Sequence, residues 1–212
     1  MAQPDTAVRI LDTAEQLFAE RGFAETSLRT ITGRAGVNLA AVNYHFGSKD
    51  ALIQAVFERF LTPFCAALDA CLDRRLAGGP AVIPPAELLA LVARTAIDLH
   101  ARDPQRTVVF MRLTGLAYSE SQGHLRGYLR AQYGRTFARL ERLLAASMPD
   151  VPREELFWRT HFALGSVVFT LSGLAPLSAL AAATFGQRPD FAEVTARLLP
   201  FLERALVQGV QS

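Results

Sequence analysis

The segment 39–49 holds the side chains whose chemistry is most specific in this sequence. Asn43 can pair with an adenine edge, and the small Ala41 can contact a thymine methyl group. Tyr44 can reach a phosphate, and Lys49 supplies a cation that suits the same partner. These residue types and their spacing predict a surface that enters a groove of DNA.

Three short helices must position these side chains. Apolar residues recur at helical spacing in segments that stop at Gly22, Gly36 and Gly47. Thr26 and Asn38 are suited to cap the second and third helices. Two short helices joined by a turn and supported by an amphipathic helix predict a helix-turn-helix, whose second short helix enters the major groove.

Helix geometry assigns the two faces of the third helix. With Val42 and Phe46 inward, the outward residues are Ala40, Ala41, Asn43 and Tyr44. His45 lies nearer the core side, so packing and a phosphate contact are equally good interpretations. Lys49 opposes the helix dipole after the Ser48 cap, which favours a phosphate anchor over a solvated filler.

Segments 18–23, 26–31, 35–39 and 43–49 (FAERGF, TSLRTI, AGVNL and NYHFGSK) resemble the DNA-binding domain of TetR-family repressors. The resemblance covers about residues 7–60. It implies that the following residues face DNA: Arg29, Leu39, Ala41, Asn43, Tyr44, His45 and Lys49. We assign three further residues to DNA binding: Thr26, Ser27 and Asn38. The family often has Tyr in place of Asn43, so operator preference does not transfer.

The rest of the chain also reads as helical, and no hairpin signal is present. Further helices are predicted at 85–101, 104–119, 121–147, 152–181 and 190–208. The fold class is therefore all-α, with about nine helices. We expect a DNA-binding domain at residues 1–48 and a ligand-binding and dimerisation domain at residues 49–212.

Composition limits the possible partners and locations. The formal net charge is +2, and residues 1–60 hold six Lys or Arg against seven Asp or Glu, so DNA affinity needs a local patch. Charged residues near the N-terminus argue against a signal peptide and predict a cytoplasmic protein. The segment 160–187 has no charged residue other than histidine, but a buried interface helix explains it better than a membrane span. Cys65 and Cys71 face different sides of a helix and do not form a pair.

A second resemblance extends over most of the chain, to the PsrA type of TetR regulator. It is carried by segments 42–56, 110–117, 121–126 and 155–159. This resemblance implies a response to a long-chain fatty acid or its coenzyme A thioester, and control of fatty-acid metabolism genes. The candidate ligand-binding residues are Phe64, Phe110, Arg112, Leu116, His124, Trp158, His161 and Phe162. An ordinary core with structural ion pairs would use the same residues.

The TetR resemblance also implies a homodimer that binds an inverted repeat in operator DNA. We expect segments 152–181 and 190–208 to pair with their symmetry mates. The stripe of Leu198, Leu202 and Leu206 is the predicted contact on the last helix.

Other functions find less support. The sequence has no Gly-x-Ser-x-Gly or His-Glu-x-x-His motif and no phosphate loop, which argues against an all-α enzyme; no cofactor or metal is expected. The intact 43–49 stretch argues against an adaptor that has lost DNA binding. A sensor of cationic drugs would favour acidic residues, which segments 110–117 and 160–187 lack. A TetR-type repressor that senses another hydrophobic molecule is the alternative function.

Overall fold

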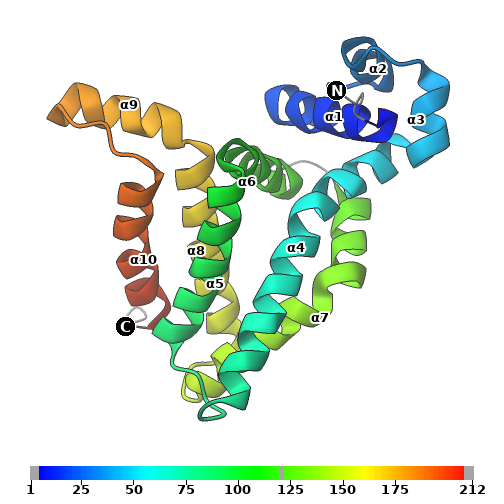
Figure 1. Cartoon of the computed structure of the whole chain (residues 1–212). Helices are drawn as coiled ribbons and strands as arrows, with labels where there is room; N and C mark the ends of the chain where they lie inside the picture. The colour runs from blue at the N-terminus through cyan, green and yellow to red at the C-terminus, as the bar shows by residue number, and fades with distance from the viewer. Residues whose placement is uncertain (1–4, 120–121, 208–212) are drawn as a thin grey trace. The chain divides into compact units, whose positions relative to one another are not determined.

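The computed structural model describes residues 5–119 and 122–207, which form ten α-helices and no strand (Figure 1). The all-α prediction is confirmed, with one helix more than expected. The helices are α1 (Thr6–Arg21), α2 (Leu28–Ala35), α3 (Leu39–Phe46), α4 (Lys49–Ala77), α5 (Pro85–Arg102), α6 (Pro104–Ser119), α7 (Gly123–Ser147), α8 (Arg153–Ser172), α9 (Leu174–Phe185) and α10 (Phe191–Val207).

The extra helix arises because the predicted helix 152–181 is two helices. It breaks at Gly173, and α8 and α9 are bent by 73° relative to one another (Figure 1). The Gly173 amide still donates to the Phe169 carbonyl at 3.1 Å, which closes α8. Pro176 then lies in the first turn of α9, where its missing N–H is tolerated, whereas a continuous helix would have lost a hydrogen bond there.

The chain divides into two compact units. The first holds residues up to Pro63 together with Arg112–Gly134, and the second holds Phe64–Met111 together with the residues from Arg135 onward. The predicted domain boundary after residue 48 lies inside the first unit. The helices α4, α6 and α7 therefore each contribute one part to each unit.

The first unit has a sealed aromatic core. Phe18 of α1 and Phe23 have ring centroids 5.4 Å apart, and Phe23 and Phe57 of α4 are 6.3 Å apart. The aliphatic side chains around them are fully or almost fully buried: Ile10, Leu17, Ile31, Val42, Leu52, Ile53 and Val56. The helical spacing of these residues places them on one side of each helix, so three short helices and the start of α4 share one core.

The second unit has two smaller clusters. One contains Leu68, Leu72, Ile83 and Leu88, with Phe64 packed against it. The other contains Ala163 of α8 with the α10 residues Leu202 and Leu206, against which Leu198 packs. The predicted use of this leucine stripe as a dimer contact is wrong, because Leu202 is only 2% exposed within the single chain. The stripe joins α10 to α8.

Two parts of the chain have the length and apolarity of a membrane span. They are α4 and the bent pair α8–α9. In α4, however, all four carboxylates contact side chains of α7. That pattern is typical of a core helix in a folded domain, which passes the same test of length and composition.

Candidate nucleic-acid interface

The turn between α2 and α3 is built from local signals. Ser27 caps α2 by accepting from the Thr30 amide at 3.0 Å, and Asn38 caps α3 by accepting from the Ala41 amide at 2.9 Å. Gly36 ends α2 in the left-handed region with φ 64°. The predicted Asn38 cap is confirmed, and α3 leaves the turn in a fixed direction.

A side chain from α1 holds this turn in place. Arg9 Nη2 donates to the carbonyl oxygens of Ala35 at 2.5 Å and Gly36 at 3.2 Å. A Cβ at Gly36 would lie 3.1 Å from the same nitrogen. A cation at the C-terminus of α2 also suits the helix dipole. Arg9 therefore positions the turn that sets the direction of α3.

The outer face of α3 carries the predicted recognition residues. Tyr44 is 86% exposed, while Val42 on the opposite face is fully buried. The other exposed residues of this helix are Leu39, Ala40, Asn43 and His45. His45 is thus on the surface and not in the core, and its ring meets that of Tyr44 edge-on at 5.0 Å. This face combines small residues with an amide and a phenol, which suits close approach to base edges.

Thr26 does not belong to this surface. It is fully buried, and its hydroxyl donates to the carbonyl oxygens of Gly22 at 2.8 Å and Leu17 at 3.2 Å. The predictions that Thr26 caps α2 and contacts DNA are therefore wrong. Ser27, the adjacent residue, is the exposed cap. Thr26 instead ties the loop between α1 and α2 to the end of α1.

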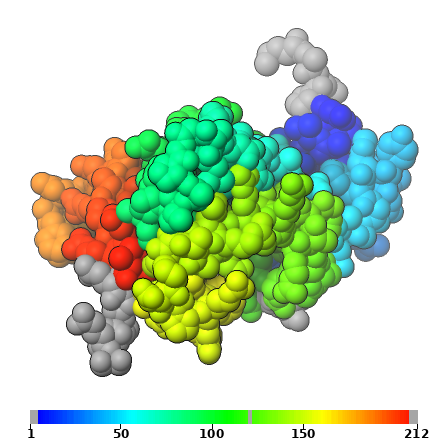
Figure 2. Space-filling view, turned by 90° about the horizontal axis from the view of Figure 1, so that it is seen from below, coloured from blue at the N-terminus to red at the C-terminus, as the bar shows by residue number. Residues whose placement is uncertain are grey.

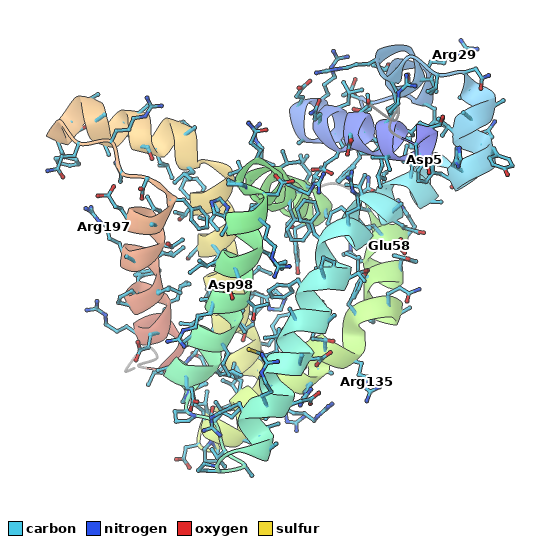
Figure 3. The ribbon with its side chains drawn as sticks, in the orientation of Figure 1. Asp5, Arg29, Glu58, Asp98, Arg135 and Arg197 are labelled. Atoms are coloured by element: carbon cyan, nitrogen blue, oxygen red, sulfur yellow. The ribbon has the colours of Figure 1, made fainter. Side chains whose placement is uncertain are left out.

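The two predicted cationic anchors differ in their surroundings. Arg29 is exposed on α2 and is directed outward in Figure 3. Lys49 is half-buried at the start of α4, and its Nζ donates to the Ala24 carbonyl at 3.4 Å. The Ser48 hydroxyl beside it accepts from the Ala51 amide at 3.0 Å, which confirms the predicted cap of α4. Lys49 therefore braces the loop before α2.

Arg59 links α1 to α4. Its Nη1 lies 2.7 Å from Asp12 Oδ1 and 3.2 Å from Glu15 Oε2. Glu15 is almost fully buried, so its carboxylate depends on this guanidinium for compensation. Sequence periodicity gives no signal for Arg9 or Arg59, because each of them joins residues that are distant in the sequence.

The predicted ligand residues are divided between the units. Arg112, Leu116 and His124 belong to the first unit, where Arg112 is exposed and His124 Nε2 lies 3.5 Å from Asp50 Oδ1. The second unit holds the remaining five: Phe64, Phe110, Trp158, His161 and Phe162.

Three of those five lie on one exposed face of α8. Trp158 is 49% exposed and Phe162 is 66% exposed, and their rings stack with centroids 5.9 Å apart. His161 Nδ1 lies 2.7 Å from the Phe157 carbonyl oxygen. Phe64 instead packs against the cluster of Leu68 and its neighbours. The structure therefore does not gather the predicted ligand residues into one enclosed site.

Two surface cavities occur in the second unit. One of about 270 Å³ is lined by Thr170, Pro189, Val194, Arg197, Leu198 and Phe201. The other, of about 240 Å³, lies where the end of α7 meets the start of α8, a surface seen in Figure 2. Neither is lined by any of the predicted ligand residues. Both are smaller than the roughly 300–1,000 Å³ of ordinary ligand pockets.

An exposed recognition face on a helix-turn-helix defines a DNA-binding protein, and two family models match the chain. Residues 10–56 match the bacterial regulatory proteins of the tetR family, and residues 90–204 match the tetracyclin repressor-like C-terminal domain. The chain therefore belongs to the TetR family of bacterial transcription regulators.

Relatives in sequence match the N-terminal part. The HTH-type transcriptional repressor Rv3405c of Mycobacterium tuberculosis is 48% identical over 58 residues, which are 27% of this chain and 31% of that protein. The regulator UidR of Escherichia coli is 40% identical over 67 residues, which are 30% of this chain and 34% of that protein. The match thus spans about a third of the length of these relatives.

A solved structure matches over nearly the whole length. The fatty acid degradation regulator FadR from Bacillus halodurans has a TM-score of 0.64 at 15% identity, covering 100% of this chain and 99% of that chain. The regulator FadR from Bacillus subtilis, solved in complex with stearoyl-CoA, has a TM-score of 0.58 at 16% identity, covering 94% of this chain and 97% of that chain. These similarities establish the fold.

Proposed function

We propose that this protein is a homodimeric repressor that binds an inverted repeat in operator DNA and is released by a long-chain fatty acid or its coenzyme A thioester. The outward face of α3 supports the DNA-binding part of this proposal. Tyr44 and Asn43 are exposed there on a helix whose inner side is buried, and the turn before it is fixed by Arg9. Each protomer supplies one such helix, so the operator mirrors the symmetry of the dimer.

A second copy of the chain is the proposed partner of the exposed aromatic face of α8. Phe157, Trp158, Phe162 and Phe169 lie there, half or more exposed. Gly165 lies among them, and nothing would lie within 4 Å of a Cβ added to it. An apolar surface that is open at a glycine suits close packing against an equivalent helix.

The proposed effector class rests on two considerations. The FadR proteins that share this fold include one bound to stearoyl-CoA. The two described cavities are too small for a long acyl chain, so entry of such a ligand must separate packed side chains in the second unit. A ligand that needs this opening prefers one conformation, and that preference is what shifts DNA affinity. A tenfold release needs about 1.4 kcal/mol, against about 0.8 kcal/mol per buried methylene. Genes of fatty-acid metabolism are the proposed targets.

The DNA-binding part is tested with operators selected from random duplexes by the wild-type protein. Asn43→Ala should cost about 1–3 kcal/mol and relax preference at one base pair. Lys49→Ala should weaken all sequences alike and lower the salt slope by about 1. Arg188→Ala, which removes an exposed cation between α9 and α10, is the control and should leave both unchanged. Equal losses with unchanged specificity and salt slope would contradict the assigned roles.

The effector is tested on the same complexes with oleate, oleoyl-coenzyme A and octanoate, each below its micelle concentration. The two long-chain ligands should raise the operator Kd while light scattering still shows a dimer, and octanoate should have little effect. Operator complexes that ignore all three ligands, yet dissociate with a chemically unrelated hydrophobic compound, would favour the alternative TetR-type sensor. The DNA-binding proposal would then stand without the fatty-acid one.

A further inference from the structure

The chain passes between its two compact units three times, each time inside a helix. The crossings fall after Pro63 in α4, after Met111 in α6 and after Gly134 in α7. Pro and Gly are the two residues least suited to a helix interior. Two of the three crossings therefore coincide with a weak point of the helix that makes them.

Pro63 interrupts the hydrogen bonding of α4. It lies in the middle of this 29-residue helix and has no N–H, so it cannot donate to the carbonyl of Arg59 one turn earlier. The Arg59 side chain is held at the same time by Asp12 and Glu15. The helix is thus fixed to α1 just before the point at which its own backbone is weakest.

Gly134 is not explained by packing or by backbone conformation. A Cβ added there would meet only the Arg130 side chain, at an ordinary 3.7 Å. Gly134 is also absent from the glycines with positive φ, so another residue could adopt its conformation. What glycine adds at this position is backbone freedom, which a helix interior ordinarily avoids.

Polar contacts between α4 and α7 anchor both helices on either side of these residues. In the first unit, the hydroxyls of Thr62 and Tyr133 are 2.7 Å apart, one residue before Pro63 and Gly134 respectively. In the second unit, Asp69 accepts from the Thr136 hydroxyl at 2.6 Å and from Arg139 at 3.1 Å.

The same pairing of α4 with α7 continues away from the crossings. Tyr128 donates to Glu58, which lies on the side of α4 toward α7 (Figure 3), and burial together with Glu58 raises the pKa of Tyr128 to about 12. Arg139 also donates to Asp73 at 2.6 Å. Each half of the helix pair is therefore stiffened within its own unit, and the weak residues lie between the two anchored halves.

From this placement we propose that Pro63 and Gly134 form a paired hinge about which the DNA-binding unit turns relative to the second unit. Gly115, one turn after the crossing in α6, gives the third connection its own weak point. The hinge operates in the free protein, and it requires neither a particular effector nor a particular operator.

The test measures the distance between one spin label in each unit of the full-length protein. Labels at Glu25 and Gln187, both exposed, are introduced as cysteines in a Cys71→Ser background. Cys65 can stay, because burial and Asp69 raise the pKa of its thiol to about 11 and keep it unreactive. Labelled chains are diluted into excess unlabelled protein, so that each dimer reports a single intramolecular distance.

Gly134→Ala should narrow the distance distribution. A helix-propensity gain of about 0.5–1 kcal/mol lowers the bent population about two- to fivefold. Pro63→Ala should narrow it as well. The matched control is Gly127→Ala in the same helix, where a Cβ also meets nothing within 4 Å and no crossing occurs. A wild-type width retained in Gly134→Ala, or equal narrowing by Gly127→Ala, would overturn the hinge.

Discussion

The first unit and the α8–α10 part of the second unit treat large apolar side chains in opposite ways. In the first unit, Phe18, Phe23 and Phe57 are sealed inside a core shared by several helices. On α8, α9 and α10, large apolar side chains are half or more exposed, including Phe162, Phe169, Leu180, Phe185 and Phe201. The first core is complete within one chain. The second region leaves apolar area that another molecule must cover.

The largest effect is expected from truncating the sealed core. Phe18→Ala should lower the free energy of unfolding by about 3–5 kcal/mol, because it removes a fully buried ring and leaves a cavity. Urea unfolding followed by circular dichroism measures the loss. A change below about 1 kcal/mol would mean that this core is not tightly packed.

The exposed face should respond through assembly and not through folding. Phe162→Ser should give monomers by light scattering while the helical content of the chain is retained, because this ring is 66% exposed within one chain. Leu202→Ser, in the buried stripe of α10, is the contrasting variant and should reduce helical content and stability. A Phe162→Ser protein that stays dimeric would remove this face from the proposed interface.

A smaller effect is expected where α1 joins α4. Arg59→Ala leaves the Glu15 carboxylate, which is 6% exposed, without its guanidinium. The expected loss of stability is about 1–3 kcal/mol. The double variant Arg59→Met with Glu15→Gln removes both charges and should recover part of it. No recovery in the double variant would show that Arg59 acts through packing alone.

The smallest effect concerns His100, whose ring stacks on Phe191 with centroids 3.4 Å apart. Burial lowers its pKa, and its Nδ1 is enclosed without a hydrogen-bond partner. The unfolded chain therefore takes up this proton first, so the contribution to stability is complete above a pH of about 6.5 and is lost as the pH falls through the lower folded pKa. His100→Phe should keep the stack and flatten the pH dependence of the urea midpoint between pH 7 and pH 5. An unchanged slope would assign that dependence to other groups.

Local signals in the sequence were sufficient for much of the fold. The spacing of apolar residues predicted α6 with the ends that the structure shows, and the Asn38 and Ser48 caps are in place. Adjacent candidates were harder to separate, because Thr26 and Ser27 are chemically equivalent caps until burial distinguishes them. The break at Gly173 was missed, although Pro176 was a visible signal for it.

Contacts between distant segments were not predictable from periodicity. A leucine stripe defines a helix face but not its partner, so the α10 stripe was assigned to a second chain when it packs on α8. For the same reason, aromatic residues on α8 were predicted to line a pocket, whereas in the single chain Trp158 and Phe162 are on the surface. Arg9 and Arg59 act on backbone or carboxylates far along the chain, and no motif marks either of them.

Lys49 is the single lysine of the chain, and it is the first residue of α4. An endoproteinase that cleaves after lysine therefore has one site in the whole sequence, at the end of a helix, where fraying gives access. Cleavage there would separate the recognition helix from everything that follows it and yield two fragments. If operator DNA covers this residue, the half-life of the intact chain under digestion becomes a label-free measure of DNA occupancy.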